Sequence, residues 1–154
     1  MKRYDLKSQL RLERSVQEVF PFFTDPRNLE ALTPSFLNFR VLGMSTDEIG
    51  EGTEIDYSLK LRGIPIRWRS QITDWNPPFD FVDTQIRGPY RFWHHLHGFQ
   101  ADGDATIATD HVTYAVYGGG LVHRWFVRPE LERIFDYRKT RMTELLPETT
   151  PLLT

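Results

Sequence analysis

The sequence contains no cysteine among its 154 residues. A disulfide framework, a thiolate nucleophile and a zinc–thiolate site are therefore excluded. Long apolar runs are also missing, because no stretch approaches the ~20 apolar residues that a membrane-spanning helix needs. Residues 1–12 alternate between charged and apolar side chains and lack the apolar centre of a signal peptide. We therefore expect a cytoplasmic protein without stable membrane insertion.

An excess of charge of one sign is absent too, since 19 Lys and Arg face 21 Asp and Glu for a formal net charge of -2. Proteins that follow nucleic-acid phosphates usually carry a basic excess or stripe, so we expect no nucleic-acid partner. Aromatic residues, in contrast, are abundant at 14% of the chain. They fill cores and also line pockets for apolar ligands, and composition alone favours the ordinary core.

Hydrophobic periodicity predicts one strand followed by two short helices. Residues 6–12 alternate with period two, as in a half-buried strand. Ser15 and Glu18 form the pattern of a capping box, and Asp25 followed by proline marks the start of a second helix. Most of the following chain alternates again, between turn signals rich in glycine, proline and aspartate. The expected strands are 36–42, 53–61, 64–75, 79–86, 90–100 and 106–117.

The period changes to about 3.6 in residues 121–146, which predicts a long amphipathic helix with a kink or restart at Pro129. A long antiparallel meander must curl to cover its apolar face, and we expect this helix to fill the concave side. The chain should form a single α+β domain over residues 1–147, followed by a frayed tail over 148–154. The apolar stripe of the helix is expected to comprise Leu121, Trp125, Leu131, Ile134, Phe135, Met142 and Leu145.

Local motifs in the same order cover nearly the whole chain. They are residues 19–20 (VF), 29–34 (LEALTP), 50–53 (GEGT), 68–72 (WRSQI), 75–78 (WNPP), 81–83 (FVD), 88–90 (GPY), 118–120 (GGG) and 135–138 (FDYR), with Trp93, His95, His97, Phe99, Asp110 and Tyr114. Together they resemble the START-like superfamily (helix-grip, SRPBCC), which includes birch-pollen-allergen-like proteins, lipid-transfer domains and polyketide cyclases. Bacterial polyketide cyclase/dehydrase-like proteins are the most similar members.

The resemblance implies a helix-grip fold. A curved antiparallel sheet of about seven strands, with two short helices after the first strand, would wrap around the long C-terminal helix. The superfamily includes transporters, receptors and enzymes on this one scaffold, so the fold does not select among functions.

The strand expected over 90–100 carries the main candidate site residues. Trp93, His95, His97 and Phe99 share one face by period two, and the resemblance implies that this face is a cavity wall. Such a wall suits a ligand with an apolar body and one polar group. The resemblance also places Asp83 toward the interior, where a carboxylate must be paired or protonated. The predicted ligand-binding residues are Trp68, Phe81, Asp83, Trp93, His95, His97, Phe99, Tyr114, Leu131 and Phe135.

The two histidines invite a metal interpretation as well. His95 and His97 could hold one ion from one face of the strand, with a third ligand from Asp83, Asp110, His111 or Glu54. A bare His-x-His pair is a weak signal, and we expect neither a metal nor another cofactor.

An acid–base enzyme is the next alternative. In it, His95 or His97 would transfer protons, Asp83 would orient the imidazole, and Tyr57 or Tyr114 would donate a hydrogen bond. Nothing in the spacing of these residues requires catalysis.

Three functions therefore stay open. The leading hypothesis is binding of a small, largely apolar ligand, such as a lipid, isoprenoid or polyketide-like compound, in an internal cavity. The second is a cyclase/aromatase or dehydratase-type lyase that uses a cavity histidine. The third is a protein-interaction module that presents the loop 43–52 to a partner. A homodimer or association with another protein is also left open.

Overall fold

The computed structural model describes residues 1–146. Two α-helices and a 3-10 turn follow the first strand, six strands come next, and helical structure ends the described chain. The elements are β1 (Tyr4–Leu12), α1 (Val16–Phe23), α2 (Pro26–Ala31), the 3-10 turn η1 (Ser35–Leu37), β2 (Arg40–Met44), β3 (Glu54–Leu61), β4 (Ile64–Asn76), β5 (Asp80–Arg87), β6 (Phe92–Asp102), β7 (Ala105–Ala115), α3 (Gly119–Val122), the π-helical turn η2 (His123–Val127) and α4 (Arg128–Leu145).

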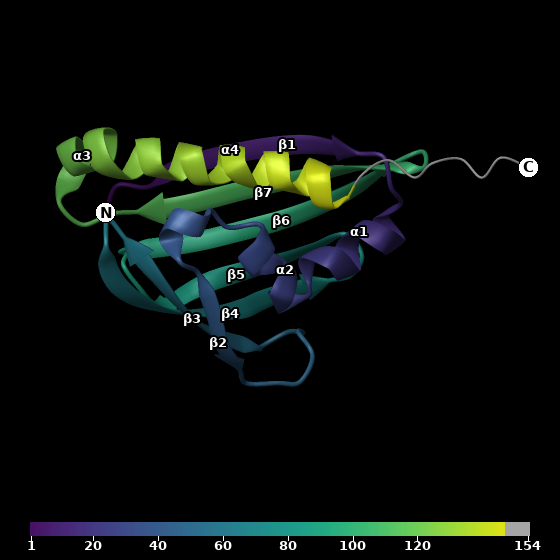
Figure 1. Ribbon diagram of the computed structural model, residues 1–154, viewed down its shortest axis with the longest axis horizontal. Helices are drawn as coiled ribbons and strands as arrows, with labels where there is room; N and C mark the ends of the chain where they lie inside the picture. The colour runs from purple at the N-terminus through teal and green to yellow at the C-terminus, as the bar shows by residue number, and fades with distance from the viewer. Residues whose placement is uncertain (147–154) are drawn as a thin grey trace, which may run out of the picture.

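The seven strands form one antiparallel sheet in the order β1-β7-β6-β5-β4-β3-β2. The first and last strands are neighbours, with Tyr4 opposite Tyr114. Figure 1 shows α4 running along β1 and β7, while α1 and α2 lie over the same face of the sheet. This arrangement is the helix-grip α+β fold that the sequence predicts.

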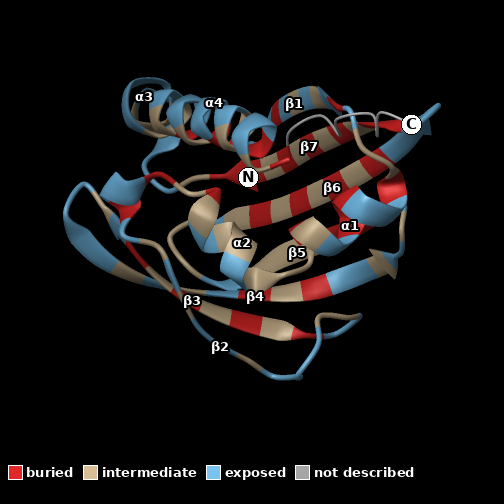
Figure 2. Cartoon of the chain, turned by 45° about the vertical axis from the view of Figure 1, so that its right-hand side comes forward, coloured by how far each residue is buried: buried red, intermediate tan, exposed pale blue. Residues whose placement is uncertain are grey.

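The alternation of buried and partly exposed residues along β6 and β7 shows which face of the sheet is inside. Trp93, His95, His97 and Phe99 are buried, whereas the residues between them are partly exposed. Buried and half-buried bands alternate along both strands in Figure 2. The predicted inner face of β6 is therefore the face that α1 and α4 cover.

Some local boundaries differ from the expected ones. The strand predicted over 36–42 begins only at Arg40, because Asn38 takes a left-handed conformation (φ 45°) that ends the 3-10 turn. Helix α1 begins where expected, but the Ser15 side chain makes no cap hydrogen bond to the described residues. Asp25 does cap α2, since its side chain accepts a hydrogen bond from the backbone N–H of Arg27 at 3.0 Å.

The predicted apolar stripe of the C-terminal helix is wrong at its start. Leu121 and Trp125 are 74% and 64% exposed. The π-helical turn over His123–Val127 has a longer repeat than an α-helix, so it shifts the phase of the side chains that precede it. Pro129 lies in the first turn of α4, directly after the π-helical turn, and it has no backbone N–H to donate to the carbonyl groups of that turn. The restart expected there is thus the beginning of α4.

No helix among residues 1–146 is long and apolar enough to span a membrane. The frayed tail predicted over 148–154, and the end of the domain at 147, lie outside the described residues.

Two apolar clusters make up the interior, and a polar layer separates them. One cluster lies at the α1 end and includes Phe99, Ala108 and Met142. The other lies at the α3 end and includes Trp93, Val112, Tyr114, Leu131 and Phe135. On β6, β7 and α4 alike, the residues between these two groups are polar: His95 and His97, Asp110, and Arg138.

Candidate functional site

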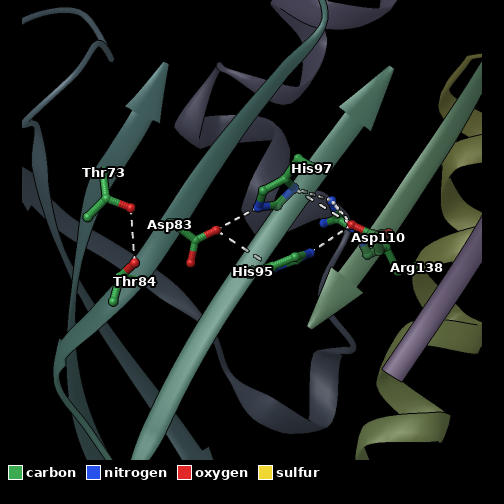
Figure 3. Close-up of polar contacts among 7 residues, drawn as sticks. All are labelled: Thr73, Asp83, Thr84, His95, His97, Asp110 and Arg138. Atoms are coloured by element: carbon green, nitrogen blue, oxygen red, sulfur yellow. Dashed lines mark hydrogen bonds and ion pairs between the residues drawn. The ribbon is translucent and has the colours of Figure 1, made fainter. Parts of the chain in front are cut away.

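The polar layer is a cluster of five side chains from four elements. Asp83 comes from β5, His95 and His97 from β6, Asp110 from β7 and Arg138 from α4 (Figure 3). The strand register places Asp83 opposite His95 and His97 opposite Asp110. Period two along each strand then turns all four side chains toward α4.

Each histidine bonds to the aspartate that is diagonal to it and not to its direct register partner. Nε2 of His97 lies 2.6 Å from Oδ2 of Asp83, and Nε2 of His95 lies 2.8 Å from Oδ1 of Asp110. The two imidazole rings stack with their centroids 3.7 Å apart. Arg138 closes the cluster from the helix side, because its Nε donates to Oδ2 of Asp110 at 3.1 Å.

The hydrogen-bond pattern assigns the protonation state of His97. Its Nε2 faces a carboxylate oxygen that only accepts, so Nε2 carries a proton. Its Nδ1 lies 3.5 Å from Nη2 of Arg138, which only donates, so Nδ1 is unprotonated. His97 is therefore neutral. Burial and the neighbouring His95 lower the pKa of His97 to about 4, despite the opposing effect of Asp83.

The two aspartates are carboxylates. Burial alone would raise the pKa of Asp83, but the hydrogen bond from His97 and the positive charges nearby lower it below the usual value. The same balance holds for Asp110, where burial is opposed chiefly by the charge of Arg138 and the hydrogen bond from His95. The pKa of Asp110 is therefore far below that of an exposed aspartate.

His95 differs from His97 in one contact of its second nitrogen: Nδ1 of each ring lies 3.7 Å from a carboxylate oxygen, but only Nδ1 of His97 also lies near the guanidinium group of Arg138. Nε2 of His95 faces Asp110, and Nδ1 lies 3.7 Å from Oδ2 of Asp83. Both ring nitrogens therefore point at carboxylate oxygens. With Asp83 and Asp110 ionised, Arg138 balances only one of the two negative charges of the cluster.

A cavity of about 160 Å³ lies beside this cluster, between the sheet and α4. Asp83, His95 and Arg138 supply its charged wall. The hydroxyl groups of Tyr57 and Ser70 lie on the same wall and are hydrogen-bonded to each other. Burial strongly raises the pKa of Tyr57. The apolar part of the wall consists of Leu32, Leu37, Phe39, Leu59, Leu61, Trp68, Tyr90, Trp93, Leu131, Ile134 and Phe135, with Thr33 beside them.

Six of the predicted ligand-binding residues line this cavity. They are Trp68, Asp83, Trp93, His95, Leu131 and Phe135. The structure places these six residues around the same cavity, and their contact with a ligand stays a prediction.

The other four predicted residues lie off the cavity wall. Phe81 and Phe99 pack edge-on against Phe20 in the cluster beneath α1. His97 stacks on Phe81 with ring centroids 4.2 Å apart and faces the polar cluster. Tyr114 belongs to the opposite cluster, where its hydroxyl lies 2.7 Å from Nε2 of His123.

Sequence reasoning named no role for Arg138, which is buried at the centre of the cluster. A signal for it exists in the sequence. Arg138 lies three residues after Phe135 and four before Met142, so it occupies the buried stripe of α4. An arginine in such a stripe requires an anionic partner inside the protein. Asp110, considered only as a metal ligand, is that partner.

The donor atoms of Asp83, His95 and His97 all lie within 4.8 Å of one another, as a metal site requires. Two ligands of one tetrahedral zinc ion would stand roughly 3.4 Å apart, given bonds of about 2.0–2.1 Å. Nε2 of His97 and Oδ2 of Asp83 are only 2.6 Å apart, which is a hydrogen-bond distance. Arg138 already supplies a cation to this cluster. The arrangement thus favours a hydrogen-bonded network over metal coordination.

The chain is similar to known proteins in structure but not in sequence. No protein-family model matches it, and no curated protein matches it in sequence. Among solved structures, the Zhui aromatase/cyclase from Streptomyces sp. R1128 superposes with a TM-score of 0.73 at 12% identity, over 94% of each chain. A START superfamily protein from Mycobacterium smegmatis gives a TM-score of 0.68 at 10% identity, over 92% of this chain and 98% of that one.

A third structure is norcoclaurine synthase from Thalictrum flavum in complex with dopamine and hydroxybenzaldehyde. Its TM-score is 0.64 at 13% identity, over 93% of this chain and 88% of that one. At such identities the likeness concerns the fold alone. The chain therefore has the helix-grip fold of START-like (SRPBCC) proteins.

Proposed function

We propose that this protein binds a small, largely apolar molecule in the cavity between the sheet and α4. The observation that carries the proposal is the cavity itself: about 160 Å³ of space, with mainly apolar and aromatic walls and a charged cluster at one side. Such concave sites with few polar groups are typical of small-molecule binding. Of the ligand classes that the sequence suggests, this volume favours the smallest members over long-chain lipids.

The similar structures support this proposal at the level of the scaffold. One is named as an aromatase/cyclase, and another holds dopamine and hydroxybenzaldehyde, two small aromatic compounds. A protein of the same fold is thus able to bind molecules of this kind.

Native mass spectrometry of the purified protein, followed by denaturing extraction, tests the proposal. A discrete apolar compound that co-purifies, or displacement of a fluorescent apolar probe, is the expected result. Leu59→Trp should fill the cavity and abolish probe binding, whereas Leu42→Trp, at an exposed position, should leave it unchanged. A protein that carries nothing and binds no apolar probe would not have this function.

The cluster supports a second candidate function, an acid–base lyase. His95 lies on the cavity wall, and its Nε2 donates to the buried carboxylate of Asp110. Such a pair can remove a proton from a carbon next to a carbonyl group and return it. Exchange of the methyl protons of acetophenone in D₂O, followed by NMR, is the assay. The enzyme hypothesis expects catalysed exchange that His95→Gln removes, and exchange at the uncatalysed rate in the unmodified protein rejects it.

A further inference from the structure

The cavity volume limits the size of the ligand more sharply than the fold does. An apolar cavity of about 150 Å³ in another protein binds benzene, whereas pockets for drug-sized ligands usually span about 300–1,000 Å³. The cavity of this protein offers about 160 Å³ of space and is partly open to solvent. A single ring with small substituents fills such a space, whereas a fatty acyl chain or a fused ring system exceeds it.

The walls favour a flat guest. Trp68 and Trp93 stand perpendicular to each other, with centroids 5.1 Å apart and an interplanar angle of 88°. Tyr90 lies 4.7 Å from Trp93 at 44°. These rings offer faces and edges in more than one direction, which are the preferred contacts of an aromatic ring. An aromatic ligand would therefore add one more ring to the contacts among Trp68, Trp93 and Tyr90.

Two polar atoms on the wall lack a hydrogen-bond partner among the described residues: Nε1 of Trp68, which is a donor, and Oδ1 of Asp83, which is an acceptor. Asp83 uses Oδ2 for its bond to His97, and Oδ1 receives no hydrogen bond from any residue in the described chain, 1–146. In Figure 3 this second oxygen points away from both histidines. The Asp83 side chain is also the most exposed of the five, at 16%, and it lines the cavity. A carboxylate oxygen without a hydrogen bond in such a place favours a ligand that can donate one.

The other charged groups are already engaged. Arg138 is turned toward Asp110, which both Nε and Nη2 contact. His95 donates to Asp110 as well. An anionic ligand would therefore meet the carboxylate of Asp83 before it found a free cation, and the like charges would repel each other.

We infer that the cavity takes a single-ring, preferably aromatic, compound with a hydroxyl or ammonium group, whose hydrogen is accepted by Oδ1 of Asp83. This inference rests on the proposed function and narrows it to one class of ligand. Neutral phenols and protonated arylalkylamines of one ring fit the class. Aryl carboxylates, fatty acids and fused polycyclic compounds do not.

A matched series of probes tests the inference by isothermal titration calorimetry on the intact protein. 4-Methylphenol should bind roughly tenfold or more tightly than 4-methylanisole or toluene, because only the phenol can donate to a charged acceptor. 4-Methylbenzoate, 2-naphthol and palmitate should not bind measurably. In Asp83→Asn, the preference for the phenol over the anisole should shrink severalfold, whereas Asp56→Asn, on an exposed ion pair, should retain it.

A second variant tests size separately. Leu59→Ala should enlarge the cavity and admit 2-naphthol, and Leu42→Ala, at an exposed position, should not. If Asp83→Asn fails to fold, the probe series on the unmodified protein still decides the matter. Equal affinity for phenol and anisole, or binding of the benzoate, would overturn the role of Asp83. Binding of palmitate or 2-naphthol to the unmodified protein, with or without binding of the phenol, would overturn the size limit. In those cases the proposed function survives, whereas it fails too if no probe binds.

Discussion

Two histidine–aspartate pairs, each with one member on β7, differ mainly in their surroundings. Asp110 and His111 are neighbours on β7, so their side chains point to opposite faces of the sheet. Inside, Nε2 of His95 lies 2.8 Å from Oδ1 of Asp110; outside, Nε2 of His111 lies 2.8 Å from Oδ1 of Asp5. The inner side chains are 8% and 9% exposed, whereas the outer ones are 30% and 57% exposed.

Equal distances therefore do not mean equal consequences. Water and salt screen the outer pair, and solvent can replace either partner at little cost. The inner pair has lost its water, so each member depends on the others for compensation. The inner cluster is also shared: Asp110 serves His95 and Arg138, and the loss of one member leaves several others unbalanced.

Removal of the buried cation should have the largest effect. Arg138→Met keeps the length of the side chain but leaves Asp83 and Asp110 without their full balancing charge. We expect a loss of about 3–5 kcal/mol in the free energy of unfolding, measured by urea denaturation. Arg69→Met, which breaks the exposed pair with Asp56 at 2.7 Å, should cost at most about 1 kcal/mol. Equal losses in the two variants would contradict the difference between inner and outer charges.

The second-largest expected effect is a loss of stability at low pH, because His97 is neutral in the folded protein. Its pKa is about 4 in the folded protein and 6.5 in its ordinary state, so the unfolded chain takes up the proton first as the pH falls. Stability is therefore expected to be full above pH 6.5 and to be lost as the pH falls toward 4, by about 3 kcal/mol. Below that range, protonation of Asp83 and Asp110, whose pKa values are lowered, removes stability in the same direction.

Urea denaturation at a series of pH values measures this effect. The pKa of His123 is also lowered by burial, so the part due to His97 is the difference between the unmodified protein and His97→Gln. His111→Gln, on the outer face, should keep the full dependence. If His97→Gln keeps it as well, His97 is not the group that titrates.

Neutralising one aspartate of each pair compares the two regions directly. Asp110→Asn can still accept a hydrogen bond but leaves Arg138 uncompensated, and we expect a loss of about 2–3 kcal/mol. Asp5→Asn makes the same chemical change on the outer face and should cost no more than about 1 kcal/mol. Thermal denaturation of both variants at pH 7 gives the comparison. A cost at Asp5 that matches the cost at Asp110 would show that burial does not control these pairs.

The sequence predicts the fold and part of this cluster, for a physical reason. Period-two alternation is a local property, so it places His95 and His97 on one face of β6, but only the resemblance to START-like proteins predicted that this face is the inner one. The order of strands and helices, with its resemblance to START-like proteins, likewise predicts the curved sheet around a helix. These expectations needed no knowledge of how distant residues meet.

What could not be predicted depends on distances between elements. The diagonal bonding of each histidine, and the approach of Arg138 from α4, are determined by sheet curvature and by the placement of the helix. The phase shift at the π-helical turn, which exposes Leu121 and Trp125, has no signal in the hydrophobic pattern. The cavity volume likewise results from how the walls pack, so the sequence could suggest a cavity but not its size.

Salt should give the smallest and most discriminating effect. A double-mutant cycle with Asp5→Asn and His111→Gln measures the coupling of the outer pair, which we expect to be below about 1 kcal/mol at low salt. In 1 M NaCl the Debye length falls to about 3 Å, so this coupling should nearly vanish. The corresponding cycle with Asp110→Asn and His95→Gln should change little, because ions do not reach a buried pair. An inner coupling that falls with salt as steeply as the outer one would mean that solvent enters the cluster, and Asp83 would then face water and not a ligand.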